Sequence, residues 1–517
     1  MIRQPAISSG LIAAVALAAA GLPAAHAAGA EAAVLDAARF RHHVERFNTM
    51  EDENRANAVP NAQSWEWLSA NIPLFECPDA AVEEIYYYRW WSLRKHLRQI
   101  DGRFVFTEFL LKDRPVSSAL GHHLMEGRWL RDQHFVSDYV LYWLRGNQGG
   151  PQEHLHKYSS WLADALYRRY LATGDAAQIV PLLDDLVRDY RQWEAEKRLP
   201  GGLFWQYDVR DAMEESISGS RTKKNVRPTI NSYMFGNARA IAAVARLAGR
   251  PEIAAEFDAK AAGLKRLTQE SLWDEQAQFF KVRLEDGGLS DAREEIGFIP
   301  WYFDLPDPGR EAAWAQFTDP QGFRAPYGIT TAERRHPRFR SHGTGTCEWD
   351  GAVWPFATSQ TLVALANLLR DYPPQTVVTS RDWFDAFLTC ARSQHDDGKP
   401  YIGEYLDEKD GHWLMGKKER SRYYNHSTFA DLVITGIAGL CPRADDTVEV
   451  RPLLPPGTWD WFCLDGVRYH GRSLTILWDR DGARYGRGKG LRVYADGRLI
   501  AESATLGPVS GKLPFQQ

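Results

Sequence analysis

Hydrophobic positions recur at helical spacing along the chain from about residue 35 to residue 440. Apolar side chains three and four positions apart share one face of an α-helix, so these runs predict amphipathic helices. The run at 155–170 ends at Gly174 and the run at 182–193 ends before Pro200, as helices commonly do. Further runs follow at 231–248, 252–271, 310–316, 355–371, 380–393 and 427–439. Because the helices come in pairs without an obvious sequence period, we expect a closed barrel of α-hairpins rather than an elongated repeat array.

Three long loops lie between these helix pairs, at 200–229, 318–354 and 394–426. They are rich in Gly, Trp and acidic residues. Loops of this length inside a compact domain are usually functional. We therefore expect the functional site on these loops, on one side of the barrel.

The pattern changes after Pro442, where short alternating segments replace the helical runs. Alternation of apolar and polar residues predicts β-strands, and the turn pairs Asp481-Gly482 and Asp496-Gly497 predict hairpins. The predicted strands are 448–450, 466–469, 474–478 and 491–494. We expect a helical domain at 28–444 and a small antiparallel β domain at 445–517, docked on it without a flexible linker.

The first 27 residues have the pattern of a secretory signal peptide. Arg3 precedes a small-residue, apolar stretch at 11–22, and residues 25–27 have the A-x-A form of a cleavage site. This stretch is shorter than the ~20 residues that a membrane span needs, and no later stretch is long and apolar enough. These features predict an exported, soluble protein, periplasmic or secreted, without membrane insertion.

Composition limits the partners and cofactors. The chain has 62 Lys and Arg against 67 Asp and Glu, a net charge of −5, which does not favour nucleic acid as a partner. Its 19 Trp, 21 Tyr and 23 Phe supply a core, but so many Trp also suit a cleft that stacks on sugar rings. The five cysteines are scattered, and dinucleotide, P-loop, serine-hydrolase and zinc-protease motifs do not occur. The sequence predicts no metal site.

The first long loop holds four carboxylates within eight residues, between aromatic side chains and glycines. A carboxyl that is kept protonated among aromatic rings can act as a general acid. Helix capping combined with surface charge is the alternative interpretation. The candidate site residues of this loop are Trp205, Tyr207, Asp208, Asp211 and Glu214.

The second long loop ends in Trp349-Asp350-Gly351, followed by Trp354 directly before a helix that begins at Pro355. We expect the two Trp rings around this Asp-Gly turn to stack on a sugar while Asp350 hydrogen-bonds to its hydroxyls. A packed aromatic corner is the alternative.

Glu404, in the third long loop, is an isolated carboxyl in an apolar, glycine-containing context. A carboxyl opposite the first cluster is what activation of a water molecule needs, although a structural hydrogen-bond acceptor is the alternative. Tyr424 and His426 lie directly before the next helix and are expected to contact the substrate. Residues 407–410 have the pattern of an exposed turn.

Arg89 belongs to an aromatic and basic run at helical spacing, residues 86–98. Core packing explains most of its rings. Arg89 is nevertheless a candidate to reach a hydroxyl or a carboxylate of the substrate.

The order of these loops resembles that of the (α/α)6-barrel glycoside hydrolases related to glycoside hydrolase family 63 and to mannosylglycerate hydrolase. Residues 349–355 look like the family's W-x-G-P-x-W-P segment, and residues 212–216 look like its G-M-D-N-S segment, whose Asp is the general acid. Residues 401–428 look like the segment that carries the general base, with Glu404 at the matching position. The acid position departs from the family, because Glu214 stands there and Asp211 lies nearby, so either is the candidate acid.

The resemblance implies a mainly α fold, an (α/α)6 barrel, with a C-terminal β domain that is not a fixed feature of these relatives. It implies inverting hydrolysis of an oligosaccharide or glycoside, in which Glu404 activates a water and the acid protonates the leaving oxygen. Inverting pairs of carboxyls lie ~6.5–9.5 Å apart, against ~5–5.5 Å in retaining enzymes. No metal ion or organic cofactor is required. The relatives favour an α-linked glucose or mannose and exo action.

Two other interpretations stay open. A different sugar-active enzyme on the same barrel, such as a lyase or an epimerase, is one of them. A lyase would need a Tyr or His pair acting on uronic acids, and Arg89 with the basic helix keeps this open. A glycan-binding protein without catalysis would not need separated carboxyls in apolar loops.

Overall fold

The structure is a computed structural model of the 517-residue chain and describes residues 33–50, 53, 57–341, 347–415 and 419–514. The predicted signal peptide at 1–27 lies outside the described residues. Within these ranges, no helix has both the length and the apolar character needed to cross a membrane.

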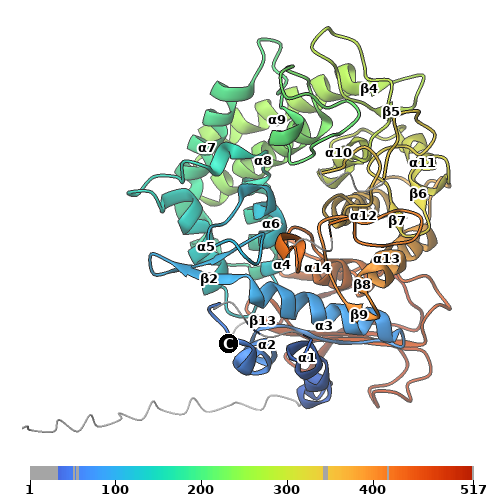
Figure 1. Ribbon diagram of the computed structural model, residues 1–517. Helices are drawn as coiled ribbons and strands as arrows, with labels where there is room; N and C mark the ends of the chain where they lie inside the picture. The colour runs from blue at the N-terminus through green and yellow to red at the C-terminus, as the bar shows by residue number, and fades with distance from the viewer. Residues whose placement is uncertain (1–32, 51–52, 54–56, 342–346, 416–418, 515–517) are drawn as a thin grey trace, which may run out of the picture.

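Six helices form a closed inner ring (Figure 1). They are α4 (Leu120–Gly127), α6 (Leu162–Thr173), α8 (Pro228–Leu247), α10 (Ile299–Tyr302), α12 (Pro355–Asp371) and α14 (Ala430–Leu432), which continues as a π-helical turn, Val433–Ile437. Each contacts the next in this order, and α14 contacts α4, so the ring closes.

The other helices of the barrel lie outside this ring, and each precedes one inner helix in the chain (Figure 1). They are α3 (Ala80–Lys95), α5 (His134–Arg145), α7 (Leu183–Lys197), α9 (Pro251–Leu272), α11 (Ala315–Thr318) and α13 (Ser380–Ser393). The N-terminal helices α1 (Arg41–Asn48) and α2 (Ser64–Asn71) pack against α3. The predicted barrel of α-hairpins is confirmed as an (α/α)6 barrel.

The predicted helices agree with the observed ones in most places, and the run at 355–371 is α12 itself. The run at 155–170 is divided, because a 3-10 turn at Leu155–Lys157 precedes α6. Between them the backbone N–H of Ser159 donates to the carbonyl of Arg210 (2.9 Å). A contact with a distant loop therefore interrupts a helix that the local spacing favours.

The third long loop is attached to the inner ring at the start of α14. Glu126 on α4 accepts hydrogen bonds from the backbone N–H groups of Phe429, Ala430 and Asp431, at 2.9–3.3 Å. The first N–H groups of a helix have no partner within the helix, and a carboxylate there is favoured by the helix dipole. Arg128 on α4 also pairs with Asp431 (2.7 Å). These contacts fix the segment that follows the third loop.

The C-terminal strands form two antiparallel sheets. The larger has the order β1-β12-β13-β14-β15 and the smaller β10-β11-β16. In the turn between β14 and β15, Asp496 and Gly497 both have positive φ, as a two-residue hairpin turn requires. All four predicted strands are present, within β11 (Thr447–Val450), β12 (Trp461–Tyr469), β13 (Arg472–Asp479) and β14 (Gly490–Ala495). The sequence did not predict the strands β10 (Leu440–Cys441), β15 (Arg498–Ser503) and β16 (Val509–Lys512).

One strand of the larger sheet comes from the N-terminal part of the chain. β1 (Leu74–Glu76) pairs antiparallel with β12, with Leu74 opposite Asp465. The larger sheet therefore combines residues from both predicted domains. Three residues are too few to show an alternating pattern, which is why the sequence did not predict this strand.

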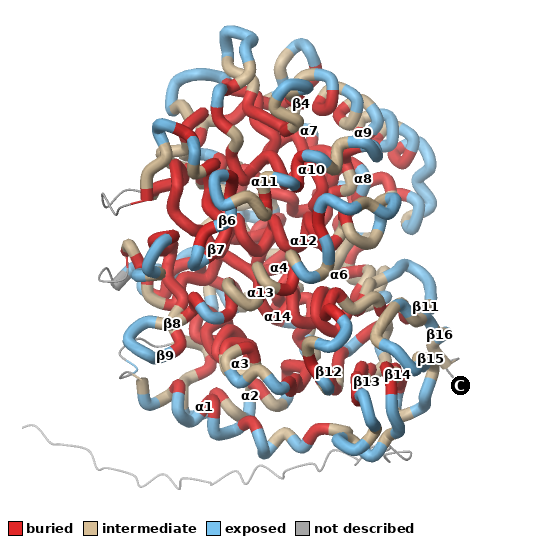
Figure 2. The backbone as a smooth tube through the Cα atoms, turned by 90° about the vertical axis from the view of Figure 1, so that its right-hand side faces the viewer, coloured by how far each residue is buried: buried red, intermediate tan, exposed pale blue. Residues whose placement is uncertain are grey.

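Among the described residues, four two-stranded hairpins extend from the loops of the barrel. They are β2 (Leu97–Ile100) with β3 (Arg103–Phe106), β4 (Trp273–Asp274) with β5 (Phe279–Phe280), β6 (Arg324–Ala325) with β7 (Gly328–Ile329), and β8 (His395–Asp396) with β9 (Lys399–Pro400). Buried residues run through the centre of the molecule, and exposed ones cover its outside (Figure 2). Most of the tryptophans belong to this core. The aromatic composition therefore reflects packing more than a sugar-binding cleft.

Candidate active site

The candidate residues lie on loops that precede inner helices. Glu214 is in the loop before α8, Trp349 in the loop before α12, and Glu404 in the loop before α14. The backbone N–H of Trp349 donates to the carbonyl of Glu214 (3.1 Å), which joins the first two loops. The charge on Glu404 raises the pKa of Glu214, so the third loop reaches the same place.

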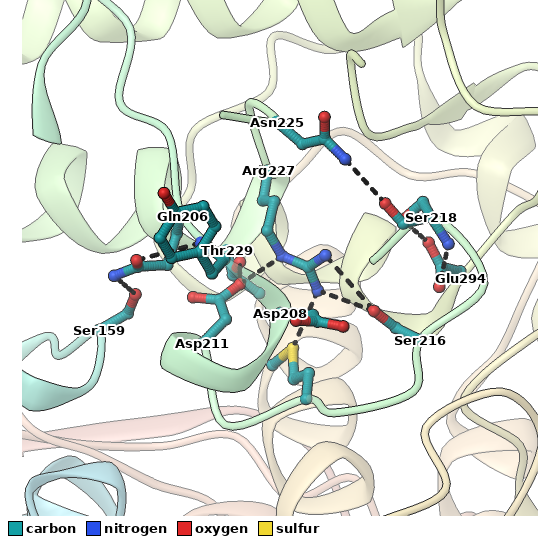
Figure 3. A network of polar contacts seen from close by, with 12 residues as sticks. Ser159, Gln206, Asp208, Asp211, Ser216, Ser218, Asn225, Arg227, Thr229 and Glu294 are labelled. Carbon is teal, nitrogen blue, oxygen red and sulfur yellow. Dashed lines mark hydrogen bonds and ion pairs between the residues drawn. The ribbon is translucent and has the colours of Figure 1, made fainter. Parts of the chain in front are cut away.

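Arg227 lies at the centre of the first loop (Figure 3). Its Nε donates to Oδ2 of Asp211 (2.8 Å), and both side chains are fully buried. Thr229 also donates to this oxygen, and Arg227 further contacts Oγ of Ser216 (3.4 Å) and the sulfur of Met213 (3.7 Å). Asp211 thus compensates the charge of a buried guanidinium. Its contacts favour a structural role that holds the loop, in place of the catalytic role considered from the sequence.

Glu214 projects from a strained part of this loop. Its neighbours Ala212 and Glu215 both have positive φ, 60° and 62°, a region that residues other than glycine rarely occupy. Glu214 is partly buried, and this burial, together with the charges of Glu404 and Asp208, raises its pKa to about 7. A carboxyl that keeps its proton to this pH suits general acid catalysis.

Three further candidates belong to the first loop: Asp208, Trp205 and Tyr207. Asp208 is buried, accepts a hydrogen bond from the N–H of Val209 (2.7 Å), and has a pKa raised by burial. Trp205 and Tyr207 meet edge to face at 4.9 Å. The ammonium of Lys197 lies 4.1 Å from the centre of the Trp205 ring. A cation therefore already occupies part of the space at the Trp205 ring.

Glu404 is 2% exposed and is held by donors from two sides. Arg420 donates to both of its oxygens (3.2 and 3.1 Å), and the hydroxyl of Ser421 donates to Oε2 (3.0 Å). The thiol of Cys347 lies 3.7 Å from Oε1. The guanidinium compensates the negative charge on Glu404 and fixes the direction of its carboxylate.

Trp349 and Trp354 form a packed aromatic stack. Their ring centres are 4.5 Å apart, and Tyr405 stacks on Trp354 at 4.6 Å. Nε1 of Trp354 donates to the carbonyl of Glu348 (2.9 Å), and both Trp rings are 2% exposed. Since Trp354 is stacked on two other rings, the packed corner is the interpretation that the geometry favours over sugar stacking.

Asp350 and Gly351 hold the backbone beside this stack. Oδ2 of Asp350 accepts a hydrogen bond from Nε of Arg340 (2.7 Å), and burial raises the Asp350 pKa. A Cβ atom at Gly351 would lie 2.0 Å from the carbonyl oxygen of Arg340. Only glycine permits this approach of two backbones, so the role of Gly351 is steric.

Arg89 does not lie free to bind a substrate. Its guanidinium is 5% exposed and donates to Oε1 of Gln394 (3.0 Å) and to the carbonyl and hydroxyl of Ser427 (2.7 and 3.0 Å). These contacts fix the segment that follows His426. The expected contact with the substrate is replaced by a structural one.

Tyr424 and His426 lie at the end of the third loop, before α14, and their contact with the substrate stays a prediction. Both ring nitrogens of His426 are buried and have no hydrogen-bond partner among the residues that the structure describes, and burial holds the pKa of His426 well below the usual range. The ring of Tyr424 meets that of His426 edge to face at 3.9 Å. A neutral imidazole in this position can donate one hydrogen bond and accept another.

The structure adds residues that the sequence interpretation missed. Glu108 is a buried carboxyl whose pKa is raised by burial and by the charges of Glu404 and Glu214, and Tyr158 has a pKa raised to about 12 by burial and by the charges of Glu108 and Glu214. Arg420 and Cys347 contact Glu404. Glu108 follows Phe106 and Thr107 and precedes Phe109, so the isolated-carboxyl pattern that singled out Glu404 also applied to it.

One group of possible metal ligands occurs among the described residues. Side-chain atoms of Asp407, Asp410 and His412 lie within 4.8 Å of one another. Asp407 accepts from the N–H groups of Lys409 and Asp410, and His412 bonds to Asp410. These are the hydrogen bonds of a turn, but the predicted exposure holds only for Lys409 and Asp410, because the side chains of Asp407 and Glu408 are buried (7% and 0% exposed).

Comparison with known proteins gives the family. Residues 112–427 match the model of the mannosylglycerate hydrolase MGH1-like glycoside hydrolase domain. Residues 443–501 match the model of the C-terminal domain of glycosyl hydrolase family 65. The resemblance seen in the sequence motifs is thereby confirmed.

Solved structures show the same fold. A chain named sialidase is 51% identical with a TM-score of 0.91 over 93% of this chain, which spans 45% of that longer chain. A family 63 mannosylglycerate hydrolase from Thermus thermophilus, in complex with glucose, is 15% identical with a TM-score of 0.52, covering 68% of this chain and 99% of its own. A family 78 rhamnosidase from Bacillus sp. GL1 is 15% identical with a TM-score of 0.59, covering 82% and 41%. On the match over residues 112–427, this chain belongs to the MGH1-like glycoside hydrolase family.

Proposed function

We propose that this glycoside hydrolase inverts the anomeric centre and releases an α-linked glucose or mannose from chain ends, with Glu214 as acid and Glu404 as base. The observation that carries the proposal is the pairing of two carboxyls in different environments. Glu214 holds a proton to about pH 7, while Glu404 is paired with Arg420. Two carboxyls in such different environments can serve as acid and base in one reaction.

In this mechanism Glu214 protonates the glycosidic oxygen as the bond to the anomeric carbon breaks. Asp211 is not the proton donor, because Arg227 compensates its charge in a fully buried pair. Proton transfer from a positioned acid contributes ~10²–10⁴-fold to rates. The longer Glu side chain replaces the Asp of the resembling families at this position.

Glu404 deprotonates the attacking water on the opposite face of the sugar. A carboxylate has about four acceptor positions. Arg420 and Ser421 fill three of them, and the thiol of Cys347, a weak donor, lies near the fourth at Oε1. This Oε1 position is where a water molecule can take the place of the thiol.

A group of buried polar atoms that have no hydrogen-bond partner within the described part of the chain supports a hydroxyl-rich ligand. They lie around the rings of Phe356 and His122 and are Nε2 of His122, both nitrogens of His426, Nε1 of Trp161 and Nε1 of Trp349. A buried polar group without a partner costs ~1–3 kcal/mol. Sugar hydroxyls can both donate to and accept from these atoms.

The proposed substrate and the proposed cellular location rest on sequence similarity and sequence pattern. The family resemblance favours α-linked glucose or mannose, whereas the 51%-identical chain is named sialidase. Sialosides therefore belong in the substrate panel. The signal-peptide pattern at 1–27 supports export, which N-terminal sequencing of the mature protein tests.

The test of the mechanism is Glu404→Gln, assayed on α-glucosides, α-mannosides and sialosides with product anomers followed by NMR. We expect inverted product from the wild type and a ~10²–10⁴-fold lower rate in the variant, since only proton acceptance is lost. Glu408→Gln is the matched control, because this carboxyl in the same loop is buried and accepts no hydrogen bond among the described residues. Activity of Glu404→Gln within a few-fold of wild type would remove Glu404 from the mechanism, and retained anomeric configuration would exclude inversion.

A further inference from the structure

Glu108 is a third carboxyl of the site, on the turn that follows β3. Its side chain is 3% exposed. The hydroxyl of Tyr424 donates to Oε1 (3.0 Å), and the hydroxyl of Ser118 lies 3.1 Å from Oε2. Among the residues that the structure describes, no Lys, Arg or His forms an ion pair with it. A buried carboxyl without a cation is unusual, because an isolated charge is costly to bury.

The hydrogen bonds to the Glu108 carboxyl come from hydroxyl groups. The guanidinium of Arg420, which lies over the ring of the adjacent Phe109, is paired with Glu404. Burial is the main cause that raises its pKa, to about 8, and the charges of Glu404 and Glu214 raise it further. In turn Glu108 raises the pKa values of Tyr424, Tyr158 and Tyr139. The side chains that bond to Glu108 or whose pKa it raises are thus hydroxyl groups, and the charges that raise its own pKa are those of carboxylates.

Glu108 also fixes one wall of the site through its main chain. Its carbonyl accepts a hydrogen bond from the N–H of Asn425 (2.9 Å), and Nδ2 of Asn425 donates to the carbonyl of Thr107 (3.1 Å). Tyr424 and His426, on either side of Asn425, are held against the turn. The hydroxyl of Tyr424 is placed by the Glu108 side chain, and its ring stands against His426 at 3.9 Å.

We propose that Glu108 is a positioning residue that works as a neutral carboxylic acid, holding Tyr424 beside Glu404 without adding a third negative charge to the site. This inference rests on the proposed function of Glu214 and Glu404. Hydrolysis needs one ionised and one protonated carboxyl, and a further anion among them would repel the ionised base. A neutral acid keeps the hydrogen bond to Tyr424 and avoids that repulsion.

The test compares Glu108→Gln with Glu108→Leu. Glutamine keeps an uncharged acceptor of the same shape, so its kcat/KM at pH 6 should exceed that of the leucine variant about tenfold or more, the cost of a buried hydroxyl left without its partner. Tyr424→Phe should lower kcat/KM of the wild type but add little to Glu108→Leu, because both changes remove one contact. Additive losses, or equal rates of the glutamine and leucine variants, would overturn the inference.

A second readout does not depend on catalysis. The infrared difference spectrum of wild type minus Glu108→Gln should contain the carbonyl band of a protonated carboxylic acid at pH 6, and this band should vanish as the pH rises through about 8. Absence of the band at pH 6 would show that Glu108 is ionised and would sink the inference even if the leucine variant failed to fold. If instead the band is present but Glu404→Gln is fully active, the proposed mechanism fails while the state of Glu108 stands.

Discussion

Replacing Asp211 and Glu214 one at a time separates a structural carboxyl from a catalytic one. Asp211→Asn removes the negative charge from a pair whose two side chains are both fully buried. Loss of one partner of such a pair costs about 3–5 kcal/mol, because the remaining charge is left uncompensated. Unfolding entropy of ~2.1 cal/mol/K per residue gives ~1 kcal/mol/K for a chain of this size, so the Tm should fall by about 3–5 °C.

Glu214→Gln should behave in the opposite way. The folded-state pKa of Glu214 is raised to about 7, so folding favours its protonated form and this contribution is lost as the pH rises through 7. An uncharged glutamine removes that loss, and the variant should be no less stable than wild type at pH 6 and slightly more stable at pH 8. Its defect should instead be catalytic. Hydrolysis of a natural glycoside should nearly stop, while a glycosyl fluoride or activated aryl glycoside, which needs little protonation, should be spared.

The assay is thermal unfolding at pH 6 and pH 8 combined with rates on a natural oligosaccharide and an activated substrate. Glu215→Gln is the control, since Glu215 is in the same loop and its ion pair with Arg221 is exposed, so its effect should stay within ~1 kcal/mol. Asp211→Asn should slow both substrates alike. An Asp211→Asn protein that melts with the wild type and loses activity only on the natural glycoside would refute the reasoning and exchange the two roles.

Three further outcomes are expected. Gly351→Ala should destabilise the protein strongly or prevent folding, seen as loss of the cooperative thermal transition, because its Cβ would lie 2.0 Å from the carbonyl oxygen of Arg340; a normal Tm would contradict this. Trp354→Ala should cost about 3–5 kcal/mol in the free energy of unfolding with little change in KM, since its ring is packed between others; the reverse would restore the sugar-stacking interpretation. The kcat/KM should fall as the pH rises through about 7, because Glu214 must hold its proton to act as acid; a profile flat to pH 9 would exclude it.

The periodic parts of the fold could be predicted, because each helix and strand carries its own pattern of apolar positions. The closed barrel and the strands β11 to β14 were therefore foreseen, whereas the inner helices α4 and α10 and the strands β15 and β16 were not. β1 was not, because a three-residue strand has no measurable period and its partner is β12, far along the chain. The same limit explains the division between Leu155 and α6, where a distant carbonyl takes the N–H of Ser159.

The location of the site on these loops stays a prediction, and the roles of its single residues depend on partners that no local pattern reveals. Asp211 and Glu214 are alike in sequence context, and only Arg227 distinguishes them. Arg89 looks like a free cation until Gln394 and Ser427 are placed beside it. Which isolated carboxyls share one site, and which rings cover each other, are questions of tertiary packing.

The pairing of β1 with β12 limits where the chain can be divided to make a fragment or a chimera. Residues 445–517 resemble a detachable unit in the sequence, yet their sheet borrows Leu74–Glu76 as an edge strand, and Arg484 pairs with Glu76 (3.3 Å). A fragment that stops before residue 461 leaves the N–H and C=O groups along one side of β1 without their β12 partners, an edge prone to association. A chimera that exchanges the C-terminal strands with those of a relative must therefore carry the matching N-terminal strand with them.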